Sequence, residues 1–136
     1  MDKTEQNIKM CEKAVKIQEA WEPKEGDYAY SQRGGVYVLF TQVILIGDAL
    51  GRFKFDHTWL PRQYQLQAMV VGGLAKKIES FYFFCLDVSR FDERYMELIS
   101  LDGDAERLNN KSMEQLWLAF VMQAKFNKTW NGKDWT

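Results

Sequence analysis

Apolar residues recur at intervals of three and four along the first twenty positions of the chain. This apolar stripe consists of Ile8, Cys11, Ala14 and Val15, and lysines and glutamates occupy the opposite face. The spacing predicts an amphipathic helix over residues 2–21 that packs against a core. Asp2, three residues before Glu5, predicts a capping box at its start. Pro23 requires the helix to end before it, because proline excludes helical geometry from the preceding residue.

The pattern changes to a β type between Lys24 and Trp59. Small or polar residues alternate with aromatic ones over Tyr28–Tyr30, and VYVLFTQVILI is dense in β-branched and aromatic residues. Polar and aromatic residues also alternate over Arg52–Phe55. Glycine-containing turns at Arg33–Gly35 and Gly47–Gly51 separate these segments. We therefore expect an antiparallel meander with VYVLFTQVILI as its central strand and Arg52–Phe55 as an edge strand.

Two further helices are predicted between this meander and the last quarter of the chain. Leu60–Pro61 has the form of a helix entry with Thr58 as the cap, since proline at the first helical position loses no hydrogen bond. Gly72–Gly73 predicts its end. The apolar run 75–84 is too short to distinguish helix from strand. Ser89 predicts the start of the next helix, followed by a polar loop.

The last helix, SMEQLWLAFVMQAKF, begins with a capping box of Ser112 and Gln115. Apolar residues almost encircle it, and they are Met113, Leu116, Trp117, Phe120, Val121 and Ala124. Side chains on every face cannot all be exposed to water, so we expect this helix at the centre of the core. An Asn-Gly turn follows between Trp130 and Trp135.

These elements predict an α+β fold in a single domain over residues 1–136. It has a small antiparallel β-meander of about three strands packed by about four helices. The chain has 136 residues, 46% of them hydrophobic and 15% aromatic, which is enough for a sizeable core and excludes a disordered chain.

The distribution of charge, the N-terminal sequence and the cysteines indicate which partners and which cellular compartment to expect. The chain carries 18 Lys+Arg against 19 Asp+Glu, and neither sign is clustered, which disfavours binding to duplex nucleic acid. The first residues lack the apolar run of a signal peptide, and no apolar stretch has the length of a membrane span. Cys11 and Cys85 stand far apart in apolar contexts, which fits a reduced compartment. We therefore expect a cytoplasmic protein without a disulfide or a membrane segment.

Catalytic and metal-binding patterns are weak. One histidine, His57, and no CxxC pair disfavour a zinc site, and no glycine-rich phosphate loop is present. The residues Asp102, Asp104 and Glu106 alternate as in a calcium loop, but the chain has Met113 where the bidentate glutamate belongs. We expect no metal, no cofactor and no catalytic residue. The alternative is a small hydrolase or nuclease that uses carboxylates and His57.

The stretch DHTWLPRQYQLQAM, residues 56–69, is the best candidate for a binding site. Tryptophan, tyrosine and arginine dominate binding hot spots. Arginine can grip a phosphate or carboxylate with two hydrogen bonds while an aromatic ring stacks on a flat ligand. The candidate residues are Trp59, Arg62, Gln63, Tyr64 and Gln67, with Arg33 converging from the first turn of the meander. The competing interpretation is a helix start with exposed glutamines.

The aromatic content also suggests self-association. Five Trp, six Tyr and nine Phe exceed what one small core needs, and Trp130 and Trp135 stand in a polar tail. Soluble chains rarely expose large apolar patches unless a partner covers them. We therefore expect a homodimer, unless the tail folds back onto its own chain.

Three segments resemble a family of small proteins encoded by bacteriophages and prophages of Firmicutes. They are KAVKIQEAWEPKEGDYAY (13–30), TWLPRQYQLQAM (58–69) and SMEQLWLAFVMQAKFNKTWNGKDW (112–135), and they cover about two fifths of the chain. The strings W-L-P-R-Q-x-Q-L-Q and E-Q-L-W-L-A-F-V-M are the most specific parts. The family has no established activity, so the resemblance implies no catalytic residue. It implies a phage product that acts inside a bacterium.

The combination predicts a non-enzymatic accessory protein that acts by binding and counters a host process such as defence. Its partner is expected to be either a host protein that it blocks or a small anionic, nucleotide-like signal that it sequesters. A nucleic-acid-binding regulator is the weakest alternative, because positive charge is not clustered.

Overall fold

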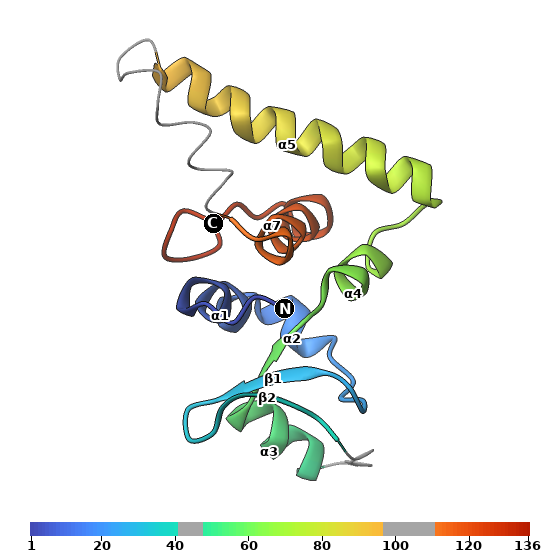
Figure 1. The fold of residues 1–136 in the computed structure, drawn as a ribbon, viewed down its shortest axis with the longest axis vertical. Helices are drawn as coiled ribbons and strands as arrows, with labels where there is room; N and C mark the ends of the chain where they lie inside the picture. The colour runs from blue at the N-terminus through green and yellow to red at the C-terminus, as the bar shows by residue number, and fades with distance from the viewer. Residues whose placement is uncertain (41–47, 97–110) are drawn as a thin grey trace.

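The protein folds as a stack of layers, with a small sheet near one end and a long helix at the other (Figure 1). The computed structural model describes residues 1–40, 48–96 and 111–136, and the side chains of all of these except 87–96. The strands are β1 (Tyr28–Ser31), β2 (Gly35–Val38) and β3 (Thr58–Leu60). The helices are α1 (Glu5–Lys13), α2 (Val15–Glu19), α3 (Asp48–Asp56), α4 (Gln63–Ala68), α5 (Leu74–Met96) and α7 (Met113–Phe126).

The α+β class with a three-stranded antiparallel sheet is confirmed, but the predicted strand order is wrong. The sheet order is β2-β1-β3, so the short strand β1 is central and pairs on both sides. Tyr28 lies opposite Val38 on one side and Leu60 on the other. The turn at Arg33–Gly35 is where the sequence predicts it, and Gly35 has a positive φ of 68° that favours glycine.

The third strand is a segment that the sequence assigns to a helix entry. Thr58 belongs to β3, where it pairs with Tyr30 of β1, and it caps no helix. The reason is local: Leu60 precedes Pro61, and proline drives the residue before it out of helical geometry into extended backbone. Helix α4 therefore begins only at Gln63, two residues beyond Pro61.

The predicted edge strand Arg52–Phe55 is instead the second half of helix α3. A run of four residues that alternates polar and aromatic side chains is compatible with a strand or with a helix. Here the tertiary contacts favour the helix. Phe53 packs against Trp21 at 5.6 Å between ring centroids, and Phe55 points into solvent. Helix α3 lies on the opposite side of the sheet from α1 (Figure 1).

The single N-terminal helix of the prediction is broken in two at Ala14. Ala14 has ψ of 61°, outside helical geometry, and the side chain of Gln18 donates to the Cys11 carbonyl beside the break. The N-cap is Thr4, which accepts from the Asn7 amide; Asp2 is not the cap. Because the break rotates the second segment, Val15 is exposed and lies outside the apolar stripe.

The prediction that the last helix forms the centre of the core is confirmed. Helix α7 packs against α1, α4 and α5. Its buried residues are Gln115, Trp117, Leu118, Phe120, Val121 and Met122. The helix is not buried all round, however, since the apolar residues Met113 and Ala124 are exposed.

The ambiguous run 75–84 and the segment predicted to begin at Ser89 form one helix, α5. Ser89 lies inside this helix and is not the start of a new one. The break predicted at Gly72–Gly73 is confirmed, and Gly72 has a φ of 112°. Three expectations lie outside the described residues: the continuation of the predicted central strand over 41–46, the part of the helix predicted from Ser89 that lies beyond Met96, and the acidic loop around Asp104.

The C-terminal tail folds back onto its own chain. Trp130 and Trp135 face each other across the Asn-Gly turn as an isolated bridge, with ring centroids 5.1 Å apart. The Trp135 indole donates to the Met10 carbonyl at 3.0 Å, and Lys13 pairs with Asp134 at 3.0 Å. These two tryptophans pack against the core, so they no longer support a dimer through the tail.

No helix in the described part of the chain combines the length and the apolar character needed to span a bilayer.

The carboxylate of Asp2 joins the starts of two helices. Its Oδ1 accepts from the Thr4 amide at 2.8 Å, next to α1. Its Oδ2 accepts from the Ser112 hydroxyl at 2.6 Å and from the Gln115 side chain at 2.7 Å, at the start of α7. Ser112 caps α7 as predicted, but the Gln115 side chain bonds to Asp2 and does not close the capping box. Partial burial raises the pKa of Asp2, but these hydrogen bonds outweigh it and hold the pKa below its ordinary value of 3.8.

We expect Trp117→Ala to lower the free energy of unfolding by about 3–5 kcal/mol, because it leaves a cavity in the core. The ring is buried and stacks on Phe81 at 4.1 Å. Met113→Ala, on the exposed side of the same helix, is the matched control and should cost under about 1 kcal/mol. Urea denaturation measures both. A loss below about 1 kcal/mol for Trp117→Ala would show that the helix is peripheral.

We expect Asp2→Asn to lower the melting temperature near neutral pH and to have little effect in acid. The pKa of Asp2 is lower in the folded state, so its charged form stabilises the fold fully above the unfolded value. That stabilisation is lost as the pH falls through the folded-state pKa, that is, below about pH 4. Melting curves of the wild type and the variant should converge there. Glu12→Gln, at an exposed position of α1, is the control, and a pH-independent difference for Asp2→Asn would contradict the assignment.

Candidate functional site

The residues Arg62 to Gln67 are fixed in place by the start of helix α4. Arg62 is the N-cap residue, and its backbone amide donates to the side chain of Gln65 at 2.8 Å. The other end of the Gln65 amide donates to Asp27 at 2.7 Å. One glutamine therefore closes the helix start and ties it to the loop before β1.

The Arg62 guanidinium is partly used by the fold. Its Nη2 donates to the Gly26 carbonyl at 2.7 Å, and the group lies over the Tyr28 ring, 4.8 Å from the centroid. The Nε group is buried and has no hydrogen-bond partner within the described ranges. No carboxylate among the described residues lies within ion-pair distance of Arg62. The side chain therefore presents a positive charge and free donor capacity.

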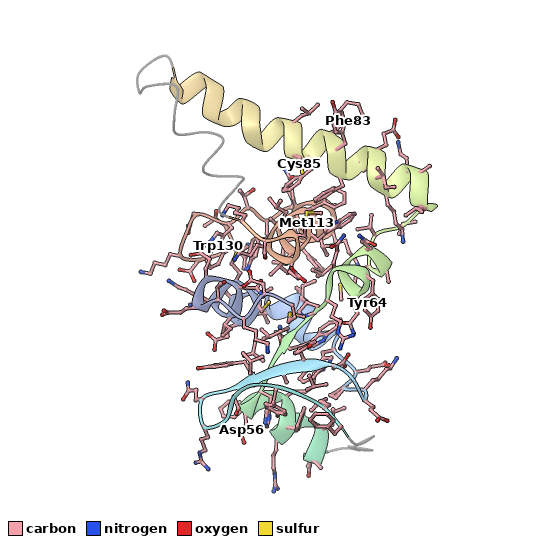
Figure 2. The ribbon with its side chains drawn as sticks, in the orientation of Figure 1. Asp56, Tyr64, Phe83, Cys85, Met113 and Trp130 are labelled. Carbon is pink, nitrogen blue, oxygen red and sulfur yellow. The ribbon has the colours of Figure 1, made fainter. Side chains whose placement is uncertain are left out.

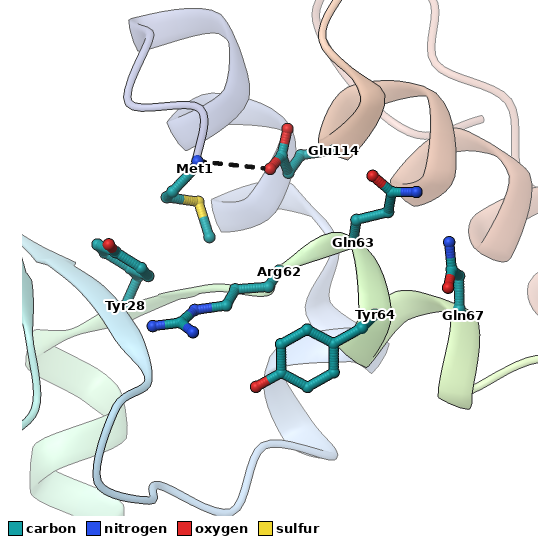
Figure 3. A pocket seen from close by; sticks show the side chains of 7 residues that line it. All are labelled: Met1, Tyr28, Arg62, Gln63, Tyr64, Gln67 and Glu114. Atoms are coloured by element: carbon teal, nitrogen blue, oxygen red, sulfur yellow. Dashed lines mark ion pairs between the residues drawn. The ribbon is translucent and has the colours of Figure 1, made fainter.

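A pocket opens in front of this guanidinium (Figure 3). Its volume is about 460 Å³, and it is a shallow hollow that is mostly open to solvent. The lining residues are Met1, Tyr28, Arg62, Gln63, Tyr64, Gln67 and Glu114. Four of the six predicted site residues thus lie together at one pocket: Arg62, Gln63, Tyr64 and Gln67.

The other two predicted site residues lie elsewhere. Trp59 is 6% exposed and stacks on Trp21 in the core, with centroids 6.0 Å apart and the rings 3° from parallel. The Trp59 side chain faces the core because β3 is a strand, and in this strand Trp59 pairs with the buried Ala29 of β1. Arg33 is exposed in the β1–β2 turn, at the opposite end of β1 from Tyr28, and does not line the pocket.

Three further charged groups lie at or near the pocket: the Lys3 ammonium, the Met1 amine and the Glu114 carboxylate. The Lys3 ammonium lies 5.9 Å from the Tyr28 ring centroid, so this ring has two cations near it. The Met1 amine pairs with Glu114 at 3.6 Å. Among the lining residues, Arg62 and the Met1 amine are positive and only Glu114 is negative, so the pocket has a positive surplus. An anionic group is the ligand that this surplus favours.

The sequence did not predict Tyr28 and Glu114 as site residues. The alternation around Tyr28 shows only a strand, and Glu114 is an ordinary acidic residue in the first turn of a helix. Their position at the pocket follows from β1 pairing with β3 and from α7 packing on α4, both of which are long-range contacts. A local pattern carries no signal for such an arrangement.

Behind the pocket lies a buried carboxylate, Asp27, which is 5% exposed. Its Oδ2 accepts from the Trp21 indole at 2.9 Å and from the Lys24 amide at 3.0 Å, and its Oδ1 accepts from Gln65. The backbone of Asp27 also accepts from the Leu39 amide at 2.9 Å. Asp27 is therefore a structural carboxylate whose lone pairs are occupied by donors from three segments.

His57 and the two cysteines have structural contacts. His57 Nδ1 lies 2.7 Å from the Phe53 carbonyl, and the ring stacks on Phe53 at 4.1 Å. Burial raises the pKa of the Cys11 thiol, and the nearby charges of Asp2 and Glu12 raise it further. Burial also raises the pKa of Cys85, and both cysteines are free.

In the part of the chain that the structure describes, no three His, Cys, Asp or Glu side chains gather in a way that could hold a metal ion.

In comparisons with known proteins, the chain matches no protein-family model, no curated protein and no solved structure. The resemblance to phage and prophage proteins therefore stays a prediction from the sequence.

We expect Asp27→Ala to lower the free energy of unfolding by about 3 kcal/mol or more, because it leaves buried donors without an acceptor. These donors are the Trp21 indole, the Lys24 amide and the Gln65 side chain. Glu25→Ala, two residues earlier and exposed, is the control and should change stability by under about 0.5 kcal/mol. Chemical denaturation of both variants tests this, and equal losses would contradict the role given to Asp27.

Proposed function

We propose that this chain is a non-enzymatic binding protein that docks a host protein through the Arg62 pocket and so blocks a host process such as defence. The observation that carries the proposal is the Arg62 guanidinium. It stacks on Tyr28 beside an open pocket, with no ion-pair partner among the described residues and with one buried donor unused. An acidic side chain of the partner would supply the missing opposite charge to the guanidinium.

The rim of the pocket has the chemistry of a protein-binding site. Tyr64 is 61% exposed, so its ring is available to a partner. Gln63 and Gln67 lie one helical turn apart on α4 and offer amide donors and acceptors beside it. Tyrosine and arginine surrounded by polar residues are the composition of a binding hot spot.

The openness of the pocket favours a protein partner over an enclosed small ligand. Small-molecule sites bury most of their ligand, commonly in cavities of about 300–1,000 Å³. The volume here, about 460 Å³, falls in that range, but most of the space is open to solvent. A side chain that projects from a partner surface fits such a hollow without being enclosed. The experiment must distinguish a protein partner from the alternative, a small nucleotide-like ligand.

The resemblance to phage and prophage proteins supports an action in the cytoplasm of a bacterial host. A small phage product that acts by binding needs a rigid recognition surface and no cofactor. The pocket has such rigidity, because hydrogen bonds from Gln65 and Arg62 fix the start of α4 against the loop before β1.

We expect Tyr64→Ala and Gln67→Glu each to weaken partner binding by at least tenfold while leaving the fold intact. Tyr64→Ala removes the exposed ring, and Gln67→Glu adds a negative charge to the pocket lining, which repels an acidic group of the partner. Neither change touches the contacts of Arg62 with Gly26 and Tyr28, whereas Arg62→Glu would remove them and destabilise the protein. Both controls lie in the exposed β1–β2 turn: Gln32→Glu is charge-matched to Gln67→Glu, and Arg33→Glu makes a larger charge change away from the pocket.

The measurement is quantitative recovery of a partner from a lysate of the bacterial host, followed by titration calorimetry with the recovered protein. Loss of binding in the two pocket variants alone supports the proposal. Equal loss in the Gln32→Glu or Arg33→Glu control would place the site at the β1–β2 turn and overturn it. A nucleotide released on denaturing the wild type, and absent from Gln67→Glu, would overturn the protein partner in favour of the small anionic ligand.

A further inference from the structure

Residues 129–136 form a short hairpin, the tail hairpin, whose turn begins with Asn131 and Gly132. Two backbone hydrogen bonds, at 2.8 and 3.0 Å, join the first and the last residue of this hairpin. Trp130, in its first half, packs against the core (Figure 2). Asn131 and Gly132 are exposed to solvent, and neither lines the Arg62 pocket. This Asn-Gly pair is therefore a chemically distinct part of the surface.

The side-chain carbonyl of Asn131 accepts two hydrogen bonds from the backbone. The Lys133 amide donates to Oδ1 at 2.9 Å, and the Asp134 amide donates to the same oxygen at 2.8 Å. Two amide donors polarise a carbonyl group and stabilise negative charge that develops on its oxygen, as in an oxyanion hole. The carbonyl carbon Cγ of Asn131 is therefore activated toward a nucleophile.

The backbone nitrogen of Gly132 is a nucleophile that can close a five-membered ring with this carbon. In the part of the chain that the structure describes, the Gly132 amide donates to no acceptor. Its φ of 95° lies in the region that favours glycine, and a Cβ at this position would meet open space. No side chain of its own residue shields the nitrogen, and the reaction is intramolecular, which favours it further.

We propose that Asn131 is a site of slow self-modification, at which the chain converts this asparagine into isoaspartate. The Gly132 nitrogen loses its proton to water or hydroxide and bonds to Cγ, and the negative charge passes to Oδ1. Nδ2 then takes a proton from water and leaves as ammonia, which produces a cyclic imide. Water opens the imide: attack at the backbone carbonyl gives isoaspartate, and attack at the side-chain carbonyl gives aspartate. The net reaction consumes one water and releases one ammonia, and it does not rest on the proposed function.

A second exposed asparagine, Asn127, shows what the tail hairpin contributes. Asn127 ends helix α7 with a φ of 52°. The amide that follows it, that of Lys128, donates to the Met122 carbonyl at 3.1 Å. The nitrogen that would attack the Asn127 side chain is therefore held in the helix cap, and it carries a residue with a Cβ. The structure thus distinguishes Asn131 as the reactive position of the two.

Conversion to isoaspartate changes the turn itself. It adds one methylene group to the main chain at the turn and replaces a neutral amide with a carboxylate. The residues that follow attach the tail hairpin to α1: Asp134 pairs with Lys13 at 3.0 Å, and the Trp135 indole donates to the Met10 carbonyl at 3.0 Å. A longer turn displaces both groups from these partners. We therefore expect the modified tail hairpin to detach from α1 more readily.

The first test is incubation of the full chain at neutral and at mildly alkaline pH, followed by peptide mapping with mass spectrometry and enzymatic labelling of isoaspartate. We expect Asn131 to convert faster than Asn127 by on the order of tenfold or more, the effect of lost oxyanion donors being at least that large. The rate should rise with pH, because the Gly132 nitrogen attacks only after losing its proton. Asn131→Gln should remove the signal. An unmodified Asn131 overturns the proposal.

The matched variant is Lys128→Gly, which creates the same dipeptide at Asn127 while the following amide still donates to the Met122 carbonyl. Asn127 should stay the slower site in the folded variant, and the two sites should convert at similar rates in urea, where only the sequence acts. Equal rates in the folded variant overturn the role given to the tail hairpin. A difference that persists unchanged in urea overturns it as well.

The second test compares the purified isoaspartate form with fresh Asn131→Asp. The variant carries the carboxylate without the added methylene group, so its side-chain oxygen can accept the same two amides. We expect the isoaspartate form to melt lower than the wild type by roughly 3–5 °C and Asn131→Asp to melt close to the wild type. Equal melting temperatures for the isoaspartate form and the wild type overturn the expected detachment.

Discussion

The described structure depends on the burial of one carboxylate, Asp27, among donors from distant parts of the chain. A buried charge is tolerated only when hydrogen bonds replace its hydration. Here the indole of Trp21, the amide of Lys24 and the side chain of Gln65 do so. The same contacts hold the end of the N-terminal helices, the start of the hairpin and the start of α4 in one place. The pocket exists because these three segments meet, since Arg62 reaches the Gly26 carbonyl next to Asp27.

A second carboxylate does the same for the helical layer. Asp2 accepts hydrogen bonds at the starts of both α1 and α7, which are more than a hundred residues apart in the sequence. Two acidic residues near polar chain segments thus determine where the apolar surfaces meet. The apolar faces supply most of the free energy of folding, but they are tolerant of small shifts, whereas a carboxylate with three donors accepts few geometries.

The sequence predicts elements that rest on local chemistry and fails where long-range contacts decide. The cap at Ser112, the turn at Arg33–Gly35 and the break at Gly72–Gly73 were all predictable, because a side chain or a glycine determines each of them locally. The third strand was not predictable from the sequence. A proline such as Pro61 is common at the first position of a helix, but it also favours extended backbone in the residue before it, so the same residue is compatible with either element. Trp59 lies in the core and not at the pocket because β3 pairs with β1, a long-range contact that no local pattern reveals. Arg62, Gln63, Tyr64 and Gln67 could be grouped because they are consecutive or one helical turn apart.

Gln18 has a consequence for how this protein can meet other chains. Its side-chain oxygen accepts from the Trp59 amide at 2.8 Å, and its side-chain nitrogen donates to the Trp59 carbonyl at 3.0 Å. These are the two backbone groups that an added strand would need at the outer edge of β3, so this edge is closed to strand addition. A closed edge protects against edge-to-edge aggregation. It also means that recognition along β3 must use side chains, whose identity can be selected, and not the backbone, which any extended chain would match.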